Sequence, residues 1–169
     1  MNRIFSFLLA LGIFTSFSPQ LLAQNTATDI CPILVGTQIP DAQLNDQNGE
    51  AVSVHQLIEK QPTILIVYRG AWCPYCNKHL SAMVDLEDEL VEMGYQILAV
   101  SPDKPSELEA TFDKHEPKYK LYSDSKMAFS DALGLSFQVD EKTIKKYKLW
   151  GIDLVKSSGE THQRLPVPA

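Results

Sequence analysis

The chain has 169 residues and a formal net charge of −6, which suits one globular domain but hardly two. An acidic protein is not attracted to nucleic acid or to an anionic membrane surface, so neither is expected as a partner. The cysteines are Cys31, Cys73 and Cys76, too few for a disulfide scaffold, so a hydrophobic core must hold the fold.

The first residues have the pattern of an export signal. Arg3 supplies a positive charge, residues 4–17 form an uncharged apolar run, and Ala23 precedes a candidate cleavage point. The run is shorter than the ~20 apolar residues that a membrane-spanning helix needs, which favours cleavage over anchoring. We therefore expect residues 1–23 to be a signal peptide and the mature protein to be periplasmic or extracellular. In such an oxidising compartment a Cys-x-x-Cys pair is expected to rest as a disulfide.

The segment after the signal is polar and has no periodicity. We expect residues 24–35 to be a flexible lead-in to one domain over residues 36–169. Cys31 lies near the end of this lead-in. It is interpreted as a lone thiol, with a resolving or intermolecular thiol as the alternative, because the cysteine count is odd.

Residues 41–54 have the pattern of a β-hairpin. Asn48 and Gly49 form a typical turn pair, and apolar residues alternate on both sides of it. Ser53 is suited to cap a short helix over residues 55–60.

A β-α-β unit is predicted next. Residues 63–68 are almost continuously apolar and β-branched, the pattern of a strand buried on both faces. Pro74 suits the first turn of a helix, which Gly94 ends, and residues 95–100 form a second buried strand. A unit of this size predicts two parallel strands with a right-handed crossover.

The second half of the mature chain predicts short elements. They are a helix over 105–115, an edge strand over 119–122, a short helix over 125–133, an extended piece over 137–139, a basic helix over 140–150 and a loop over 152–164. The lysines of the basic helix are interpreted as a solvated face.

The chemistry is predicted at the junction of the first buried strand and its helix. Cys73 and Cys76 are separated by two residues and can form a short intrachain disulfide, and the positive end of a helix favours the thiolate form. Trp72 before the first cysteine and Pro74 between the two strengthen the redox interpretation over a structural disulfide. A zinc site would need about two further ligands, and His79 faces away from the loop. We therefore expect neither a metal nor a cofactor.

Two roles remain open for the two thiols. Either Cys73 is the more exposed, attacking thiol with Cys76 buried behind it as the resolver, or Cys76 attacks and Cys73 resolves. Arg69 could assist by stabilising a thiolate or by binding a peroxide oxygen. The alternative for Arg69 is a surface salt bridge.

The block from Val67 to Cys76 resembles the peroxiredoxin-like branch of the AhpC/TSA family, and its Cys-Pro-Tyr-Cys also resembles glutaredoxins. On the family's usual motif, Pro-x-x-x-Thr-x-x-Cys, Cys76 falls at the peroxidatic position, Cys73 at the threonine and Arg69 at the proline. The resemblance covers nearly the whole mature chain. It implies an α/β, thioredoxin-like fold with a central mixed sheet flanked by helices.

The sequence also departs from this family. Cys73 in place of threonine supplies a resolving thiol but removes a peroxide-binding residue, and no arginine matches the family's second arginine. The resemblance makes Pro168 the candidate for the cis-proline that faces the cysteines. Two strands and a helix normally follow it, so we expect a chain that is truncated before the last strands, either a fragment or one completed by a homo-oligomer partner. Residues 63–68 would then be an exposed edge.

These patterns predict a thiol peroxidase with an antioxidant role. Cys73 and Cys76 would reduce a hydroperoxide through a dithiol/disulfide cycle, and a thioredoxin-like reductant would restore the dithiol. The alternative is a protein thiol-disulfide oxidoreductase that exchanges with oxidised thiol substrates through a mixed disulfide. A third, non-enzymatic hypothesis is a copper-binding module with Cys73, Cys76 and His162 as soft ligands.

Overall fold

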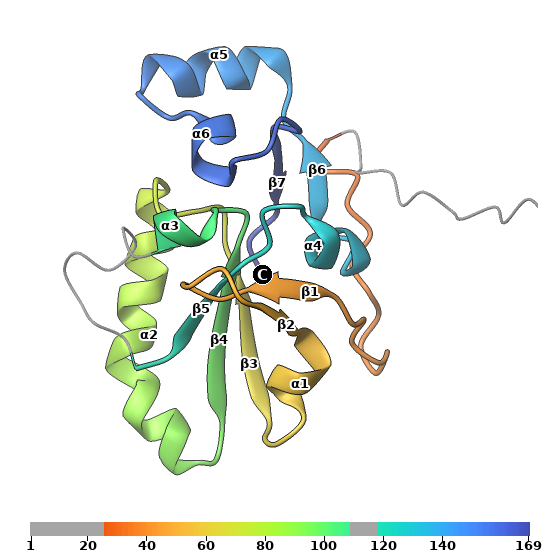
Figure 1. The fold of residues 1–169 in the computed structure, drawn as a ribbon, viewed down its shortest axis with the longest axis vertical. Helices are drawn as coiled ribbons and strands as arrows, with labels where there is room; N and C mark the ends of the chain where they lie inside the picture. Colours follow the sequence, from red (N-terminus) through yellow and green to blue (C-terminus); the bar gives the residue numbers. More distant parts are fainter. Residues whose placement is uncertain (1–25, 109–117) are drawn as a thin grey trace, which may run out of the picture.

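The computed structural model describes residues 26–108 and 118–169 (Figure 1). The predicted signal peptide over residues 1–23 and most of the helix predicted over 105–115 lie outside these residues. In the part of the chain that is described, no helix is long and apolar enough to cross a membrane.

A five-stranded mixed sheet forms the centre of the molecule, in the order β2-β1-β5-β4-β3. β3, β4 and β5 are parallel, and β1 is antiparallel to both β2 and β5. The strands are β1 (Gln43–Asn45), β2 (Ala51–Ser53), β3 (Thr63–Val67), β4 (Gln96–Ser101) and β5 (Lys120–Ser123). The predicted α/β fold with a central mixed sheet is confirmed.

The predicted hairpin and its capped helix are both present. Gly49 has a φ of 82°, which a glycine adopts easily, and its N–H donates to the carbonyl of Asp46 at 3.0 Å. α1 (Val54–Ile58) follows with Ser53 as N-cap. Ser53 and Gln56 form a capping box in which each side chain accepts from the other's backbone N–H.

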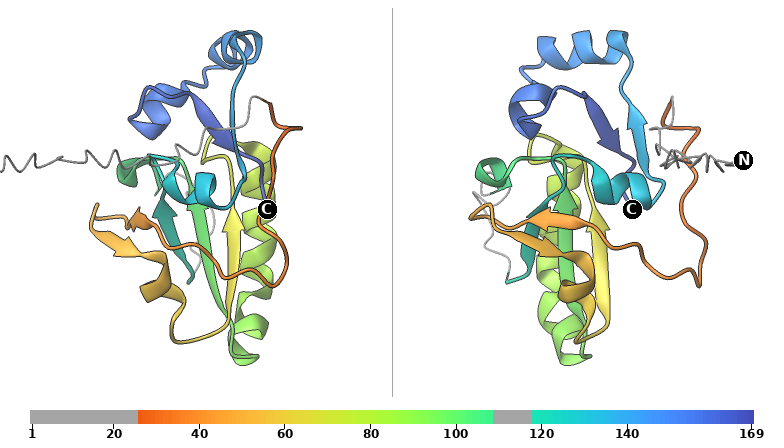
Figure 2. Two further views of the ribbon diagram at one scale, coloured as in Figure 1. Left: turned by 90° about the vertical axis from the view of Figure 1, so that its right-hand side faces the viewer. Right: turned by 45° about the vertical axis from the view of Figure 1, so that its right-hand side comes forward.

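The β-α-β unit is confirmed with α2 (Pro74–Glu92) as its crossover helix between β3 and β4. Gly94 lies just beyond the helix with a φ of 88°. α2 covers one face of the sheet, where Leu80 packs in one buried cluster with Ile66 and Ala99. α1 lies on the opposite face (Figure 2). The sheet is therefore covered on two sides by helices, as in a three-layer arrangement.

Two sequence predictions are wrong. Residues 119–122 were expected at a sheet edge, but β5 lies between β4 and β1 because the hairpin adds its strand outside it. Residues 152–164 were expected to be a loop, but they contain α6 (Leu154–Ser158) and the start of β7 (Arg164–Pro166). Elements of three to five residues are too short to show a periodic pattern.

The remaining elements lie at one end of the sheet. They are α3 (Pro105–Leu108), α4 (Ala128–Ala132), β6 (Ser136–Gln138) and α5 (Glu141–Leu149). β6 and β7 pair as a separate antiparallel ribbon, and α5 and α6 extend beyond it at the top of Figure 1. The lysines of α5 are exposed, as predicted.

Part of the predicted lead-in belongs to the folded unit. The N–H groups of Cys31 and Ile33 donate to the carbonyls of Gly134 and Leu133, both at 3.1 Å, and Ile33 packs against the core. The expectation of a flexible segment up to residue 35 is therefore wrong for this stretch. Cys31 itself is exposed and free.

Candidate active site

A short loop joins β3 to α2, and a hydrogen bond to the buried carboxylate of Asp103 holds it in place. Tyr68 is buried and its N–H donates to Val100 O at 2.9 Å, which ends the strand. Gly70 has a φ of 136°, and a Cβ there would lie 2.7 Å from Oδ1 of Asp103. Asp103 Oδ2 accepts from the N–H of Ala71 at 2.8 Å. The loop therefore needs glycine at position 70, both for its φ and for the close approach of Asp103.

Asp103 was missed by the sequence analysis. It follows the C-terminal end of β4, is only 1% exposed, and also accepts from Ser101 Oγ at 3.2 Å. Burial raises the pKa of Asp103 to about 6, although the hydrogen bonds from Ala71 and Ser101 act in the opposite direction. The position of Asp103 after a predicted parallel strand could have indicated its role. Parallel strands bring their C-terminal ends to one edge of the sheet, so a carboxylate after β4 lies near the loop that follows β3.

The two predicted redox cysteines are in contact at the start of α2. The thiol of Cys76 donates to Cys73 Sγ at 2.7 Å, and both residues are free cysteines. Cys73 is the N-cap, and its sulfur also accepts from the backbone N–H of Cys76 at 3.3 Å. Pro74 occupies the first turn, as predicted. The sulfurs are thus close enough for an intrachain disulfide between the ends of one helical turn.

Both thiols are buried, which corrects one prediction. Cys73 is 1% exposed and Cys76 is 6% exposed, so Cys73 is not the more exposed of the pair. The reason is that Cys73 turns its sulfur inward to cap the helix rather than outward to solvent. Both sulfurs pack in the same buried cluster as Leu80 and Tyr68.

Arg69 contacts the pair instead of a surface carboxylate. Its Nη2 donates to Cys73 Sγ at 3.4 Å, and no described Asp or Glu lies within ion-pair distance of it. Partial burial disfavours its charge, but the neighbouring Cys73 and Cys76 raise the pKa of Arg69 overall. Its buried Nε has no hydrogen-bond partner among the described residues. A cation with one unused donor therefore lies beside the thiols.

Negative charge is best accommodated on the sulfur of Cys73. This sulfur accepts from Arg69 Nη2, from the Cys76 N–H and from the Cys76 thiol. Burial and the hydrogen bond with Cys73 raise the pKa of Cys76 to about 11, which keeps its thiol protonated at neutral pH. In this arrangement the sulfur of Cys73 is the hydrogen-bond acceptor and the thiol of Cys76 is the donor.

Trp72 connects the pair to the far end of the molecule. Its ring lies 5.3 Å from the ring of Tyr147 in α5, measured between centroids. Asn77, one turn into α2, donates its side-chain N–H to Ala71 O at 2.8 Å. Contacts on either side of the cysteines therefore hold the loop, and Tyr75 between them remains exposed.

Other residues singled out in the sequence do not join this site. Both ring nitrogens of His162 have backbone partners, Ser125 O at 2.7 Å and the Arg164 N–H at 3.0 Å. The third hypothesis, copper binding through His162, is therefore not supported. Within residues 26–108 and 118–169 no group of three metal-ligating side chains is present. His79 is exposed on the surface of α2.

Pro168 does not have the expected geometry. Every peptide bond between described residues is trans, the bond before Pro168 included, so the prediction of a cis-proline at this position is wrong. The side chain is also exposed.

Arg164 cannot act as a second site arginine, because it forms an ion pair with Asp131 and donates to Ser136 Oγ at 2.8 Å.

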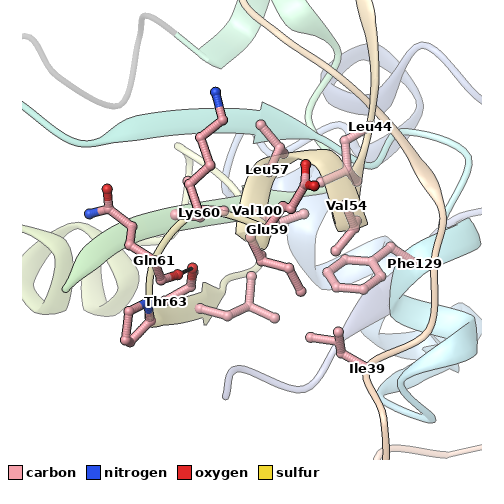
Figure 3. Close-up of a pocket in the computed structure, with 14 residues that line it drawn as sticks. Ile39, Leu44, Val54, Leu57, Glu59, Lys60, Gln61, Thr63, Val100 and Phe129 are labelled. Atoms are coloured by element: carbon pink, nitrogen blue, oxygen red, sulfur yellow. Dashed lines mark hydrogen bonds between the residues drawn. The ribbon is translucent and has the colours of Figure 1, made fainter. Parts of the chain in front are cut away.

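A large cavity lies away from the cysteines (Figure 3). It has a volume of about 490 Å³ and lies on the sheet face opposite α2, between α1 and the first half of β3. Leu44, Val54 and Phe129 form part of its apolar wall. Its lining contains no cysteine.

Comparison with known proteins identifies the family of the chain. A family model described as the AhpC/TSA family matches residues 35–153, which include the loop and both cysteines. The chain belongs to the AhpC/TSA family. Peroxiredoxin-2C of Oryza sativa is 32% identical over 121 residues, covering 67% of this chain and 75% of that protein. Peroxiredoxin Bcp of Escherichia coli is 29% identical over 120 residues, covering 71% and 67%.

Solved structures have the same fold as this AhpC/TSA protein. Peroxiredoxin 5 from Alvinella pompejana superimposes with a TM-score of 0.58 at 26% identity, covering 67% of this chain and 75% of that one. Reduced Prx3 from Vibrio vulnificus in complex with H2O2 superimposes with a TM-score of 0.60, covering 64% and 72%; its 24% identity shows the fold alone. The thioredoxin-like fold and the peroxiredoxin-like oxidoreductase class predicted from the sequence are confirmed.

Proposed function

We propose that this AhpC/TSA protein reduces hydroperoxides through a dithiol/disulfide cycle of Cys73 and Cys76. The observation that carries the proposal is the contact between the two sulfurs, 2.7 Å apart, beside the guanidinium of Arg69. Both thiols are almost fully buried, which suits a small substrate such as a hydroperoxide. The unused Nε of Arg69 is a donor suited to a peroxide oxygen.

In the proposed cycle the thiolate of Cys73 attacks the terminal oxygen of the hydroperoxide. The O–O bond breaks, the alcohol or water leaves with a proton, and Cys73 becomes a sulfenic acid. The thiol of Cys76 then attacks this sulfur, the S–S bond forms and water leaves. A dithiol reductant returns two electrons and two protons by thiol-disulfide exchange and is itself oxidised to a disulfide.

The hydrogen bonds that the sulfur of Cys73 accepts support Cys73 as the attacking residue. Alignment with the family motif would instead place Cys76 in that role. In an anaerobic reaction with one equivalent of H2O2, we expect Cys76→Ser to accumulate a dimedone-reactive sulfenic acid at Cys73. Cys73→Ser should give far less, and Cys31→Ser is the matched control. A sulfenate that forms only in Cys73→Ser would assign the attack to Cys76.

The activity itself is tested by stopped-flow oxidation of the reduced protein with H2O2 at pH 7. We expect a rate constant at least about a hundredfold above that of free cysteine, since positioned charge typically supplies such factors. A rate equal to that of free cysteine would exclude a peroxidase.

A protein thiol-disulfide oxidoreductase is the second candidate. It is favoured by the position of Cys73 at the N-cap of α2, where backbone N–H donation and the helix dipole stabilise a thiolate that attacks disulfides. Catalysed reduction of insulin by dithiothreitol, together with slow oxidation by H2O2, would support this candidate over the peroxidase.

A further inference from the structure

α5 forms a basic surface on an otherwise acidic protein. Its nine residues include four exposed lysines, Lys142, Lys145, Lys146 and Lys148, and one glutamate, whereas the whole chain has a net charge of −6. None of the four lysines takes part in an ion pair within the described residues. This cluster of charge is therefore open to a partner.

Large apolar side chains lie beside these lysines. Leu149 is 86% exposed and Trp150 is 61% exposed at the C-terminal end of the helix. Lys146 Nζ lies 4.7 Å from the centre of the Trp150 ring, and this ring lies 6.3 Å from that of Tyr147. An exposed Trp flanked by cations is the composition that protein interfaces favour.

The same helix reaches the redox pair. Tyr147 contacts Trp72, the residue directly before Cys73. Tyr147 also acts electrostatically on Arg69 and contributes to its raised pKa. On the other side of the pair Tyr75 is 79% exposed in the first turn of α2. Side chains of α5 and the exposed Tyr75 therefore lie on two sides of the cysteine pair.

We propose that Lys145, Lys146, Lys148, Leu149 and Trp150, here called the α5 surface, dock an acidic dithiol protein that reduces the Cys73–Cys76 disulfide. The inference rests on the proposed function, for which it locates the surface where the reductant docks. One thiolate of the partner attacks a sulfur of the disulfide, its second thiol releases the mixed disulfide, and the electron pair passes to the cysteines.

Charge selects the partner. The remainder of the chain is acidic and repels an acidic protein, so attraction is confined to α5, beside the disulfide that must be reduced. An anionic membrane is the less suitable occupant. The large apolar side chains exposed beside α5 are confined to its C-terminal end, whereas an interfacial helix needs a continuous apolar face.

The test measures reduction of the oxidised protein by stopped-flow tryptophan fluorescence. Three reductants are compared: a Cys-Gly-Pro-Cys peptide flanked by Asp and Glu, the same peptide flanked by Lys, and dithiothreitol. We expect the acidic peptide to react roughly tenfold faster than the basic peptide at low salt, and this difference to vanish at 1 M NaCl. Equal rates for the two peptides would overturn the proposal.

A charge-reversal variant tests the position. Lys145→Glu, Lys146→Glu and Lys148→Glu together should remove the preference for the acidic peptide without changing reduction by dithiothreitol. The variant and the wild type should have the same circular dichroism spectrum, since these side chains are exposed.

The matched control moves the same charge elsewhere. Lys60→Glu, Lys120→Glu and Lys126→Glu together alter exposed lysines outside α5 by the same amount. This control should keep the preference, and an equal loss in both variants would overturn a local docking surface. Binding of wild-type protein to phosphatidylserine vesicles that depends on α5, without a peptide preference, would overturn the protein partner in favour of a membrane. Because reduction is measured without peroxide, a failed peroxidase assay does not affect this result.

Discussion

Cys73 and Asp103 both stabilise the loop between β3 and α2. Cys73 caps the helix with its sulfur, and Asp103 accepts the N–H of Ala71 from beneath. Both side chains are 1% exposed, so neither interaction is weakened by competing water. Cys73 therefore helps to fix the shape of the loop in addition to its proposed chemical role.

Arg69 is predicted to accelerate the reaction with peroxide. Arg69→Met keeps the aliphatic stem but removes the charged donor to Cys73 Sγ. A hydrogen bond to a charged group contributes about 1.5–3 kcal/mol, so the stopped-flow rate with H2O2 should fall roughly tenfold to a hundredfold. Lys78→Met, which removes an exposed charge from the first turns of α2, is the control. A similar loss in both variants would mean that the overall positive charge, and not the hydrogen bond from Arg69, determines the rate.

Asp103 is predicted to make stability depend on pH. Its pKa is raised to about 6 in the folded protein, against 3.8 for an ordinary Asp, so the folded state holds a proton that the unfolded state has lost. The cost of ionising it is absent below pH 4, grows as the pH rises, and reaches about 3 kcal/mol above pH 7.

Urea unfolding of the wild type and of Asp103→Asn at pH 4, 5, 6 and 7.5 checks this. The free energy of unfolding of the wild type should decline relative to the variant by about 2.5 kcal/mol across the series. Glu107 contributes slightly to the same shift, and Glu107→Gln measures its part. A difference that stays constant with pH would contradict the prediction.

β3 pairs on one side along its length and on the other side only at its end. Gln96 N donates to Pro62 O and Tyr68 N donates to Val100 O. The backbone N–H and C=O groups of the even-numbered residues of β3 therefore point toward β4. Val67 faces away and exchanges two backbone hydrogen bonds with Ala169, at 2.7 and 3.1 Å. In the described part of the chain, the first half of this strand is thus the open edge of the sheet.

Amide exchange along β3 should alternate as a result. Ile64 and Ile66 donate to β4 and should exchange at least about tenfold more slowly than Thr63 and Leu65, whereas Val67 should be protected by Ala169. Hydrogen exchange followed by NMR measures each amide. Protection of Leu65 that increases with protein concentration would show instead that a second chain covers the edge.

In the whole molecule, chemistry and the large cavity lie at different places. The cysteines follow the C-terminal end of β3, whereas the cavity opens beside its first half, on the opposite face of the sheet. The α5 surface lies beyond the same end as the cysteines (Figure 1). The proposed substrate reduction and the proposed docking of a reductant therefore both lie at one end of the molecule.

We propose from the sequence that the protein is exported and cleaved. Expressed with its first 23 residues in a bacterial host, it should yield a mature form that begins near Gln24, as intact mass and N-terminal sequencing would show. Leu8→Arg interrupts the apolar run and should stop processing, whereas Leu8→Ile should not. A mature protein that retains residue 1 would contradict export by cleavage.

Features encoded by near neighbours could be predicted from the sequence. The Asn48-Gly49 turn, the Ser53 cap, the apolar strands and the cysteines at the start of α2 each depend on a few adjacent residues, and all are present. The motif around Cys73 also indicated the family, because it is contained within ten consecutive residues of the sequence.

Tertiary structure decided what depends on residues far apart in the chain. Asp103 lies 32 residues from the loop that it supports, and Tyr147 meets Trp72 only after α5 has packed. β5 is interior because the hairpin adds a strand beside it. The sequence by itself singled out the two cysteines to which we assign the proposed redox chemistry. Packing alone decided that both sulfurs are buried, that Arg69 donates to Cys73, and that a basic helix lies beside them, because burial and long-range contacts belong to the folded chain as a whole.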